Sequence, residues 1–460
     1  MSGVLGVFST AGRSVMEELF YGLCALQHRG EEGCGVAIAS PERILVKKAN
    51  EPVYDFLRDE VPFLEAIHPR AGVGHTLYER SSGLQPTSTR RGHWRVSLAM
   101  DGVLVGVPSP QELYVERVFL DALEATGDLV QAANRLLGAV EGYGSCNVVA
   151  LVQHDGAATV LALRGPRGIK PLCLGRKDGA YLVASESKGL DGAEADLVGD
   201  VEPGELIVID ENGIARHQLR EAVHQHCAFE WVYFADPTSI IEGRNVYLVR
   251  KMLGKMLAQA YPLEVDLVIC SPDSGRGVAL GYAHARGLPF EEAVIKNPGA
   301  KRTFQVEDPE ERRRAARAKF FITQAVIDGR RVALGDDSIV RGTVAREGMI
   351  SKLRRAGAAE VHLLISCPAL CYPCFKDPAS RTYAAYGLHH LPAQEVGRRV
   401  ARKLGADSVC YPSVAMLQEA IGHQDLCRAC MDGIYPVAEE VLGRATGGGS
   451  PSGTDGGGSV

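Results

Sequence analysis

Two adjacent carboxylates at the end of an apolar run are the residues whose types and spacing best suit chemistry. Asp336 and Asp337 follow this run, and the short loop Ser338–Thr343 separates them from the start of an expected helix. Backbone N–H groups in such a loop and at a helix start form an anion site. The carboxylates suit ribose hydroxyls, held directly or through Mg²⁺, which prefers carboxylates plus substrate oxygens. An acidic strand end with an ordinary helix cap is the weaker alternative.

A second candidate site lies near the C-terminus, where Cys427 and Cys430 form a C-x-x-C pair. This spacing is shared by zinc sites and iron–sulfur sites. The chain has 12 cysteines, and the N-terminus lacks the basic region of a signal peptide. In a cytosolic chain such cysteines are thiols or metal ligands before they are disulfides.

The elements that must position these residues differ between the two halves of the chain. Residues 1 to about 222 contain short apolar, β-branched runs bounded by glycine turns, which are typical of strands, and one helical pattern at Val15–Gln27. The expected strands of this half are Val4–Phe8, Gly35–Ile38, Val96–Met100, Val148–Val152 and Tyr181–Ala184. The pattern predicts a mixed, strand-rich layered architecture.

From about Asp266 the pattern changes to buried apolar strands that alternate with helices, which predicts a parallel sheet with crossover helices. The expected strands are Asp266–Cys270, Arg331–Leu334 and Val361–Ser366. The expected helices are Gly277–Ala285 and Thr343–Arg355. We therefore expect domains at residues 1–222 and 223–444, followed by a disordered Gly/Ser-rich tail at 445–460.

Length, charge and hydropathy exclude several classes of protein. At 460 residues the chain is too long for one core. Its net charge of −6 argues against non-specific binding to nucleic acid or to an anionic membrane. The Arg312–Arg314 run alternates with acids and is typical of a solvated helix face. No apolar run approaches the length needed to span a bilayer, so we expect a cytoplasmic protein.

The loop Asp336–Thr343 resembles the phosphoribosyl pyrophosphate (PRPP) fingerprint of glutamine PRPP amidotransferases, and the resemblance covers nearly the whole chain. Other segments match in order and spacing. They are Ala25–Gly30, Gly165–Leu172, Ala184–Ser187, Val201–Glu205, Phe229–Ala235 and Ser271–Gly275. The resemblance implies an α/β and α+β protein, in which an N-terminal nucleophile hydrolase-like αββα domain precedes a type I phosphoribosyltransferase α/β domain. It also implies a homo-oligomer, either a dimer or a tetramer.

The resemblance also implies roles for individual residues. Asp336 and Asp337 would hold the ribose and Mg²⁺, and Asp273, Ser274 and Gly275 would lie at the pyrophosphate, with Ser274 near Mg²⁺. The loop that would bind the 5′-phosphate consists of Ser338, Ile339, Val340, Arg341, Gly342 and Thr343.

Four cations match basic positions on and after the family's mobile loop, where positive charge would stabilise the leaving pyrophosphate. They are Lys296, Arg302, Arg317 and Lys319. Each could instead be a surface cation. Gly299 replaces a tyrosine that helps to seal the family's ammonia path, and Gly335 replaces an apolar residue before Asp336. Either change could also be neutral.

The resemblance gives the cysteine pair two partners. Cys227 and Cys374 match positions at which some family members ligate a [4Fe–4S] cluster, together with Cys427 and Cys430. Structural zinc bound by four cysteines is the alternative. We interpret Cys367 and Cys371 as spectator thiols. A cluster would brace the fold rather than carry electrons, because the implied transfer involves no redox change.

The groups that the family uses for glutamine hydrolysis are replaced. Ser2 stands where the nucleophilic cysteine follows the initiator methionine, and a hydroxyl is far less acidic than a thiol. Leu77 replaces the arginine that binds the glutamine carboxylate. Asp101 replaces the oxyanion asparagine, where a carboxylate would repel a developing oxyanion. Tyr114 aligns with the acid that holds the substrate amino group. We interpret the first domain as a degenerate glutaminase that serves as a scaffold.

The sequence therefore predicts a Mg²⁺-dependent enzyme that transfers ribose 5-phosphate from PRPP to a nitrogen nucleophile other than glutamine-derived ammonia. A heterocyclic base, purine-like or deazapurine, is the preferred acceptor, and another small amine is also open. Synthesis of phosphoribosylamine from free or partner-supplied ammonia is the rival activity. A catalytically silent PRPP-binding regulator is the third reading, although the intact Asp336–Thr343 segment argues against it.

Overall fold

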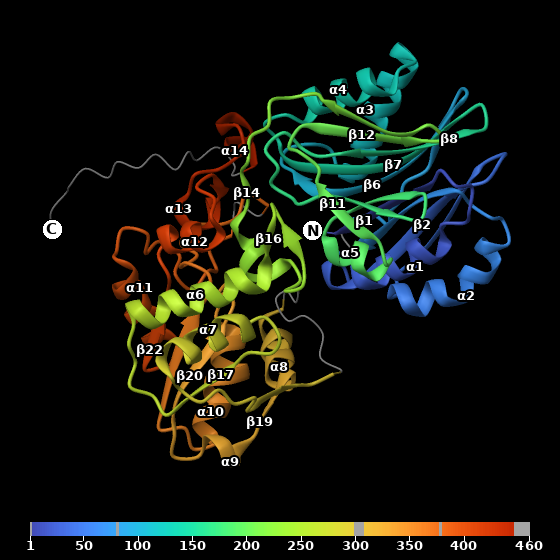
Figure 1. The fold of residues 1–460 in the computed structure, drawn as a ribbon. Coiled ribbons are helices and arrows are strands. Elements are labelled where there is room, and N and C mark those ends of the chain that lie inside the picture. The colour runs from blue at the N-terminus through green and yellow to red at the C-terminus, as the bar shows by residue number, and fades with distance from the viewer. Residues whose placement is uncertain (1, 80–81, 299–307, 377–379, 446–460) are drawn as a thin grey trace.

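The computed structural model describes residues 2–79, 82–298, 308–376 and 380–445. It separates into an N-terminal part, which runs through β13, and a C-terminal part, which begins with β14 (Figure 1). The expected domain boundary at residue 222 falls in the connection between these two strands and stays a prediction. The Gly/Ser-rich stretch after residue 445, Gly299 and Arg302 lie outside the described residues.

Two β-sheets stack face to face in the N-terminal part. The first has the strand order β11-β9-β10-β1-β4-β2-β3, and the second has the order β13-β12-β8-β7-β6-β5. The strands of the first sheet are β1 (Gly3–Ser9), β2 (Gly33–Ala39), β3 (Ile44–Ala49), β4 (Ala71–Leu77), β9 (Cys173–Lys177), β10 (Ala180–Ala184) and β11 (Asp196–Asp200). Those of the second are β5 (Thr89–Arg91), β6 (Trp94–Leu104), β7 (Gly144–His154), β8 (Ala157–Leu163), β12 (Glu205–Asp210) and β13 (Gly213–Gln218).

Helices cover the outer faces of both sheets. On the first sheet lie α1 (Met16–Ala25), α2 (Val53–Glu65) and α5 (Ser187–Gly192), and on the second lie α3 (Gln111–Thr126) and α4 (Leu129–Val140). A third apolar cluster fills the space between the sheets, with Val4, Val73 and Val149 among its members. The result is a four-layered αββα arrangement, as the strand-rich pattern predicts.

The C-terminal part is built on a parallel sheet with the order β17-β20-β21-β22. Its strands are β17 (Leu267–Cys270), β20 (Arg331–Asp336), β21 (Glu360–Ile365) and β22 (Ser408–Cys410). The helices of this part are α6 (Val246–Ala260), α7 (Arg276–Arg286), α8 (Pro309–Lys319), α9 (Gln324–Ile327), α10 (Ser351–Arg355), α11 (Ala393–Leu404), α12 (Val414–Ile421), α13 (Ala429–Asp432) and α14 (Glu439–Ala445).

Short pairs of strands and irregular helical turns complete this part. The strand pairs are β14 (His226–Cys227) with β23 (Leu426–Cys427), β15 (Ile240–Ile241) with β16 (Arg244–Asn245), and β18 (Val294–Lys296) with β19 (Phe320–Ile322). Two turns are π-helical, η2 (Glu230–Phe234) and η4 (Val344–Ile350). No helix in the described ranges is both long and apolar enough to cross a membrane.

Three expected elements differ from the observed ones. The helix expected at Val15–Gln27 ends at Ala25, where the carbonyl oxygen of Ala25 lies 3.1 Å from Nδ1 of His28, and a 3₁₀ turn follows at Gln27–Arg29. The helix expected at Thr343–Arg355 begins as η4 and becomes α-helical only in α10. The strand expected to end at Leu334 continues to Asp336, because Gly335 and Asp336 still pair with β21.

Arg313 and Arg314 are exposed on α8, and Arg313 pairs with Glu310, as expected of a solvated face.

Candidate functional site

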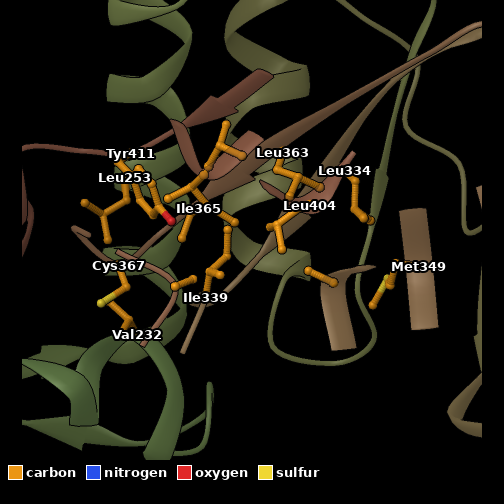
Figure 2. Close-up of a cluster of buried hydrophobic side chains, with 14 of the residues drawn as sticks. Val232, Leu253, Leu334, Ile339, Met349, Leu363, Ile365, Cys367, Leu404 and Tyr411 are labelled. Atoms are coloured by element: carbon orange, nitrogen blue, oxygen red, sulfur yellow. The ribbon is translucent and has the colours of Figure 1, made fainter. Parts of the chain in front are cut away.

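The side chain of Ile339 anchors the loop after β20 in the hydrophobic core. Ile339 is 2% exposed and belongs to the core of the C-terminal part, together with Ile365 and Leu404 (Figure 2). Gly342 has a φ of +80°, and a Cβ there would lie 2.6 Å from Leu404 Cδ2, so this position requires glycine. With Ile339 buried, the polar atoms of the loop are left at the surface of the cavity described below.

The strands beside β20 hold the two carboxylates in place. At the end of β21, the backbone N–H of Cys367 donates to the carbonyl oxygen of Asp337 (2.9 Å), and the Ser366 hydroxyl donates to the same oxygen (3.1 Å). The backbone N–H of Asp337 donates to Asp336 Oδ1 (3.0 Å). Asp336 and Asp337 thus lie at the carboxyl end of a central parallel strand, which is the usual edge for ligands in α/β sheets.

The segment expected at the pyrophosphate lies directly against this strand end. The backbone N–H of Ser271 donates to the carbonyl oxygen of Gly335 (2.8 Å), and the Ser274 hydroxyl donates to Asp337. A Cβ at Gly275 would lie 2.2 Å from the Gly335 oxygen. A Cβ at Gly335 would in turn lie 2.7 Å from Ala279 Cβ on α7. The close approach of two backbones therefore explains both glycines.

Burial raises the pKa values of both carboxylates, and the charge of Asp337 adds to the effect at Asp336. Asp336 and Asp337 are only 7% and 8% exposed. Burial, followed by the charge of Asp337, raises the pKa of Asp336 to about 8. Burial likewise raises the pKa of Asp337, with opposing effects from the Ser274 and Ser338 hydroxyls. A cation beside this pair would relieve the cost of ionising it. The carboxylate and hydroxyl oxygens of Asp336, Asp337 and Ser274 fit Mg²⁺.

Of the cations expected around the pyrophosphate, some lie near the two carboxylates and one does not. Lys319 borders the cavity, and its charge lowers the pKa values of Asp336 and Asp337. Lys296 Nζ lies 3.6 Å from the Asp273 carboxylate, at the expected pyrophosphate segment. Arg317 instead pairs with Glu347 at 3.0 Å on an exposed face. Arg341 lines the cavity and its Nε donates to Thr382 Oγ1 (3.0 Å).

A cavity of about 310 Å³ runs from the two carboxylates to the N-terminal part. The loop from Ser338 to Thr343 lines one end. The N-terminal part contributes Tyr78, Val103, Ser145, Ile169 and Lys170 at the other. Aromatic side chains also line the cavity, namely Phe229, Tyr233, Phe234, Phe375 and Tyr383. A ligand next to the carboxylates would therefore be enclosed by both parts of the molecule.

The four cysteines expected to ligate a cluster line this same cavity. They come together because β14 pairs with β23 in parallel, with Cys227 opposite Cys427. Burial, followed by the neighbouring thiols Cys374, Cys367, Cys227 and Cys427, raises the pKa of Cys430 well above its usual value. The described cysteines form no disulfide.

Single-ion binding by these thiols has no support among the described residues. No group of three His, Cys, Asp or Glu there is placed to hold one metal ion. Four thiolates are a donor set that suits both a [4Fe–4S] cluster and structural zinc. Cys367, expected to be a spectator, is a buried core residue. Its thiol nevertheless influences the pKa of Cys430. Cys371 is buried in the same core.

The region around Ser2 contains a different kind of acidic cluster. The backbone N–H of Ser2 donates to Asp101 Oδ1 (2.9 Å), and Arg29 Nε donates to the Ser2 carbonyl oxygen (3.1 Å). Arg29 also pairs with Asp101 (3.1 Å), with Glu186 (2.5 Å) and with Glu230 (3.1 Å). Lys170 Nζ donates to Glu230 Oε1 at 2.7 Å. We call Arg29, Asp101, Lys170, Glu186 and Glu230 the ionic cluster.

The ionic cluster keeps its acids charged. Burial alone would raise the pKa of Asp101, but Arg29 and Lys170 outweigh burial and lower it. The same two cations lower the pKa of Glu230 against the effect of burial. Leu77 is 1% exposed at the end of β4, and Tyr114 is half-buried on α3. At the positions that the resemblance assigns to the glutamine carboxylate and to the oxyanion, the structure therefore has a buried apolar side chain and a carboxylate paired with Arg29.

Sequence reasoning missed several residues of the cavity. Lys170, Phe229, Tyr233 and Phe234 line the cavity and lie in segments that carry the resemblance, but no role was assigned to them or to the nearby Glu230. The density of aromatic residues in Phe229-Glu-Trp-Val-Tyr-Phe was the available signal. Lys376 Nζ lies 4.5 Å from the centre of the Tyr78 ring and donates to Glu79 (2.7 Å), a contact between the two parts that no local pattern reveals.

A scan against protein-family models found no match. The chain is 34% identical to the amidophosphoribosyltransferase of Methanocaldococcus jannaschii, over 96% of this chain and 100% of that protein. The chain belongs to the amidophosphoribosyltransferase family. The amidophosphoribosyltransferase of Mycobacterium tuberculosis is also 34% identical, over 96% of this chain and 88% of its own length.

A solved structure agrees with this assignment. The glutamine PRPP amidotransferase of Bacillus subtilis, complexed with ADP and GMP, matches with a TM-score of 0.81 and 30% identity, over 95% of this chain and 97% of that one. As a family member, the chain is a PRPP-dependent phosphoribosyltransferase. Its fold is a nucleophile hydrolase-like αββα layer followed by a type I phosphoribosyltransferase sheet, as the sequence predicted.

Proposed function

We propose that this amidophosphoribosyltransferase family member transfers ribose 5-phosphate from PRPP to a nitrogen nucleophile that is not released from glutamine at Ser2. The observation that carries the proposal is a contrast within one molecule. The loop Asp336–Thr343 keeps its carboxylates and its exposed backbone groups, whereas Asp101 at the Ser2 site is paired with Arg29. Family membership supports the PRPP chemistry, and the ionic cluster supports the loss of the glutaminase step.

In this proposal the chain's own groups bind and orient PRPP. The backbone N–H groups of Ser338–Thr343 bind the 5′-phosphate, and Asp336 and Asp337 hold the ribose hydroxyls. Lys319 and Lys296 place positive charge near the departing pyrophosphate. Mg²⁺, when bound, adds further positive charge to the pyrophosphate oxygens. The nucleophile enters from the part of the cavity that Tyr78, Ile169 and Lys170 border.

Ammonia is the first candidate acceptor. The relatives named above are amidophosphoribosyltransferases, which supports phosphoribosylamine synthesis better than the heterocyclic acceptor that the sequence favoured. The ammonia would be free in solution or supplied by a partner protein. With no glutamine hydrolysed at Ser2, the cavity would have to admit ammonia from outside.

A heterocyclic base is the second candidate, and the shape of the cavity favours it. Planar aromatic rings stack on other aromatic rings, and Phe229, Tyr233, Phe234, Phe375 and Tyr383 line the cavity that also contains the two carboxylates.

One experiment separates these acceptors. Pyrophosphate release from PRPP and Mg²⁺ would be measured with ammonium chloride, with glutamine, and with a panel of purine and deazapurine bases. We expect release with ammonium or with a base, and none with glutamine. Glutamate release from glutamine, or stoichiometric labelling of Ser2 by diazo-oxo-norleucine, would contradict the proposal. Tight PRPP binding without release for any acceptor would favour the silent regulator.

We also propose a [4Fe–4S] cluster held by Cys227, Cys374, Cys427 and Cys430 with a structural role. Anaerobically purified protein is expected to be brown and to contain about four irons per chain. Colourless protein with one zinc per chain would contradict the iron–sulfur assignment. Cys427→Ser is expected to lose solubility or stability before activity. A homo-oligomeric, cytoplasmic protein remains part of the proposal, and analytical ultracentrifugation measures the oligomeric state.

A further inference from the structure

The short turn η2 connects the ionic cluster to the lining of the cavity. Glu230 is the first residue of η2, and it accepts from both terminal nitrogens of Arg29 (3.1 Å each) and from Lys170 Nζ (2.7 Å). The neighbouring rings Phe229, Tyr233 and Phe234 line the cavity. We call these three rings the aromatic wall. Glu230, which binds both cations of the ionic cluster, therefore lies in the same turn as the aromatic wall.

Lys170 makes the connection more direct. Its Nζ lies 5.3 Å from the centre of the Phe234 ring while it donates to Glu230, and Lys170 itself borders the cavity. A cation over an aromatic face is attracted by the ring, and burial strengthens that attraction. Lys170 therefore contacts both a carboxylate of the ionic cluster and a ring of the wall.

The turn depends on contacts from outside itself. η2 spans five residues, and a hydrogen bond from the backbone N–H of Ala235 to the backbone carbonyl oxygen of Glu230 (3.0 Å) closes it. Arg250 on α6 donates to the carbonyl oxygens of Trp231 (2.7 Å) and Ala235 (2.8 Å). The C-terminal part thus holds the backbone of the turn, and the N-terminal part holds it through the Glu230 carboxylate.

We infer that Arg29, Lys170 and Glu230 are positioning residues that fix the aromatic wall against which the acceptor binds. The site around Ser2 thereby serves the transferase reaction by shaping its acceptor cavity. The inference rests on the proposed function only in assigning the acceptor to this cavity. The positioning of the wall itself can be measured without any acceptor.

The kinetic test compares two buried carboxylates that have the same kinds of partner. Glu230 pairs with Arg29 and Lys170, and Glu18 pairs with Arg13 (2.7 Å) and Lys177 (3.6 Å), each with a side chain 1% exposed. Glu18 is on α1, and neither it nor its partners line the cavity. Glu18→Gln is therefore the matched control for Glu230→Gln.

The first readout is the KM for the acceptor. It is measured with the acceptor that the wild-type protein uses, which is either ammonium or a base from the panel. Glu230→Gln is expected to raise the KM for this acceptor about tenfold or more, with a smaller change in the KM for PRPP. Glu18→Gln is expected to lower stability while leaving both KM values near those of wild type. Equal KM changes in the two variants, or unchanged acceptor KM in Glu230→Gln, would overturn the inference.

Tryptophan fluorescence gives a second readout that needs no acceptor. The chain has two tryptophans, and Trp231 is a fully buried member of η2. In a Trp94→Phe background, Glu230→Gln is expected to shift Trp231 emission to the red and to increase acrylamide quenching, whereas Glu18→Gln leaves both unchanged. Unchanged emission in Glu230→Gln would overturn the inference even if wild type proves inactive with every acceptor.

A milder variant keeps the test decisive if Glu230→Gln does not fold. Lys170→Met removes one contact to Glu230 and one to Phe234 while keeping the length of the side chain. The same red shift and acceptor KM increase are expected, at smaller amplitude. Absence of both changes in a folded Lys170→Met protein would overturn the inference.

Discussion

Two sites in this molecule contain buried aspartates whose pKa values are shifted in opposite directions. Asp336 and Asp337 accept from hydroxyl and amide groups, and burial raises the pKa values of both. Asp101 pairs with Arg29, and its pKa is lowered despite complete burial. A cation that binds at the first site would therefore stabilise the ionised carboxylates there. At the second site, the Arg29 guanidinium already stabilises the ionised Asp101. The partners of the carboxylates thus set the two sites apart: hydroxyl and amide groups at the first, a buried guanidinium at the second.

The largest expected effect comes from neutralising the first site. Asp336→Asn together with Asp337→Asn removes the charge that we propose holds Mg²⁺ and the ribose, so pyrophosphate release is expected to fall by roughly 10² to 10³. Because the charged forms of both residues are penalised by burial, thermal stability without ligand at pH 8 is expected to be unchanged or higher. A calorimetric scan beside the activity assay measures both. A large loss of stability would show that these carboxylates are structural.

The opposite outcome is expected at the second site. Asp101→Asn removes one of three carboxylates that pair with the buried Arg29, and Glu186 and Glu230 remain, so the cost is expected at or below the lower end of the range of about 3–5 kcal/mol for breaking a buried ion pair. The asparagine also keeps the size of the side chain. Urea unfolding at pH 7.5 measures the change. An unchanged midpoint would mean that the ionic cluster contributes little to stability.

A smaller effect is expected from pH, through a histidine near the second site. Burial lowers the pKa of His75 on β4 to about 3, against 6.5 for the ordinary group. Below pH 6.5 the unfolded chain binds a proton that the folded protein does not, so stability falls as pH decreases from 6.5 towards 3. The loss by pH 5 is about 2 kcal/mol for this residue.

His75→Gln is the variant that checks the pH effect. Urea unfolding of wild type and variant at pH 7.5 and pH 5 is expected to show a smaller pH dependence in the variant. Equal pH dependence in both proteins would mean that other groups, such as His226, whose pKa burial also lowers to about 3, dominate acid destabilisation.

Much of the fold follows from local patterns. The apolar runs at Val4–Phe8 and Val148–Val152 lie within β1 and β7, because buried strands need continuous apolar surface. The order of Asp336, Ser338 and Gly342 also predicts the shape of the loop, since one strand and one glycine turn determine it.

The ionic cluster does not follow from local patterns. Arg29 and Glu230 are 201 positions apart, and only the packing of two parts of the chain brings them together. Asp101 was expected to repel an oxyanion, but its pairing with Arg29 depends on the shortened α1 and the 3₁₀ turn after it. The aromatic lining of the cavity was missed for the same reason, because Tyr78 and Phe234 come from different parts of the fold.

The pairing of β14 with β23 has a consequence for biosynthesis. Cys227 lies just after the N-terminal part, and its neighbour Cys427 lies close to the end of the described chain. Because domains generally fold in order as they leave the ribosome, the αββα layers can form while the wall that carries Cys427 and Cys430 is still missing. A chain interrupted before residue 426 would therefore lack the partner strand of β14 and the part of the cavity lining that Cys427 and Cys430 supply. Closure of this part of the cavity therefore waits until the segment that carries β23 has been synthesised.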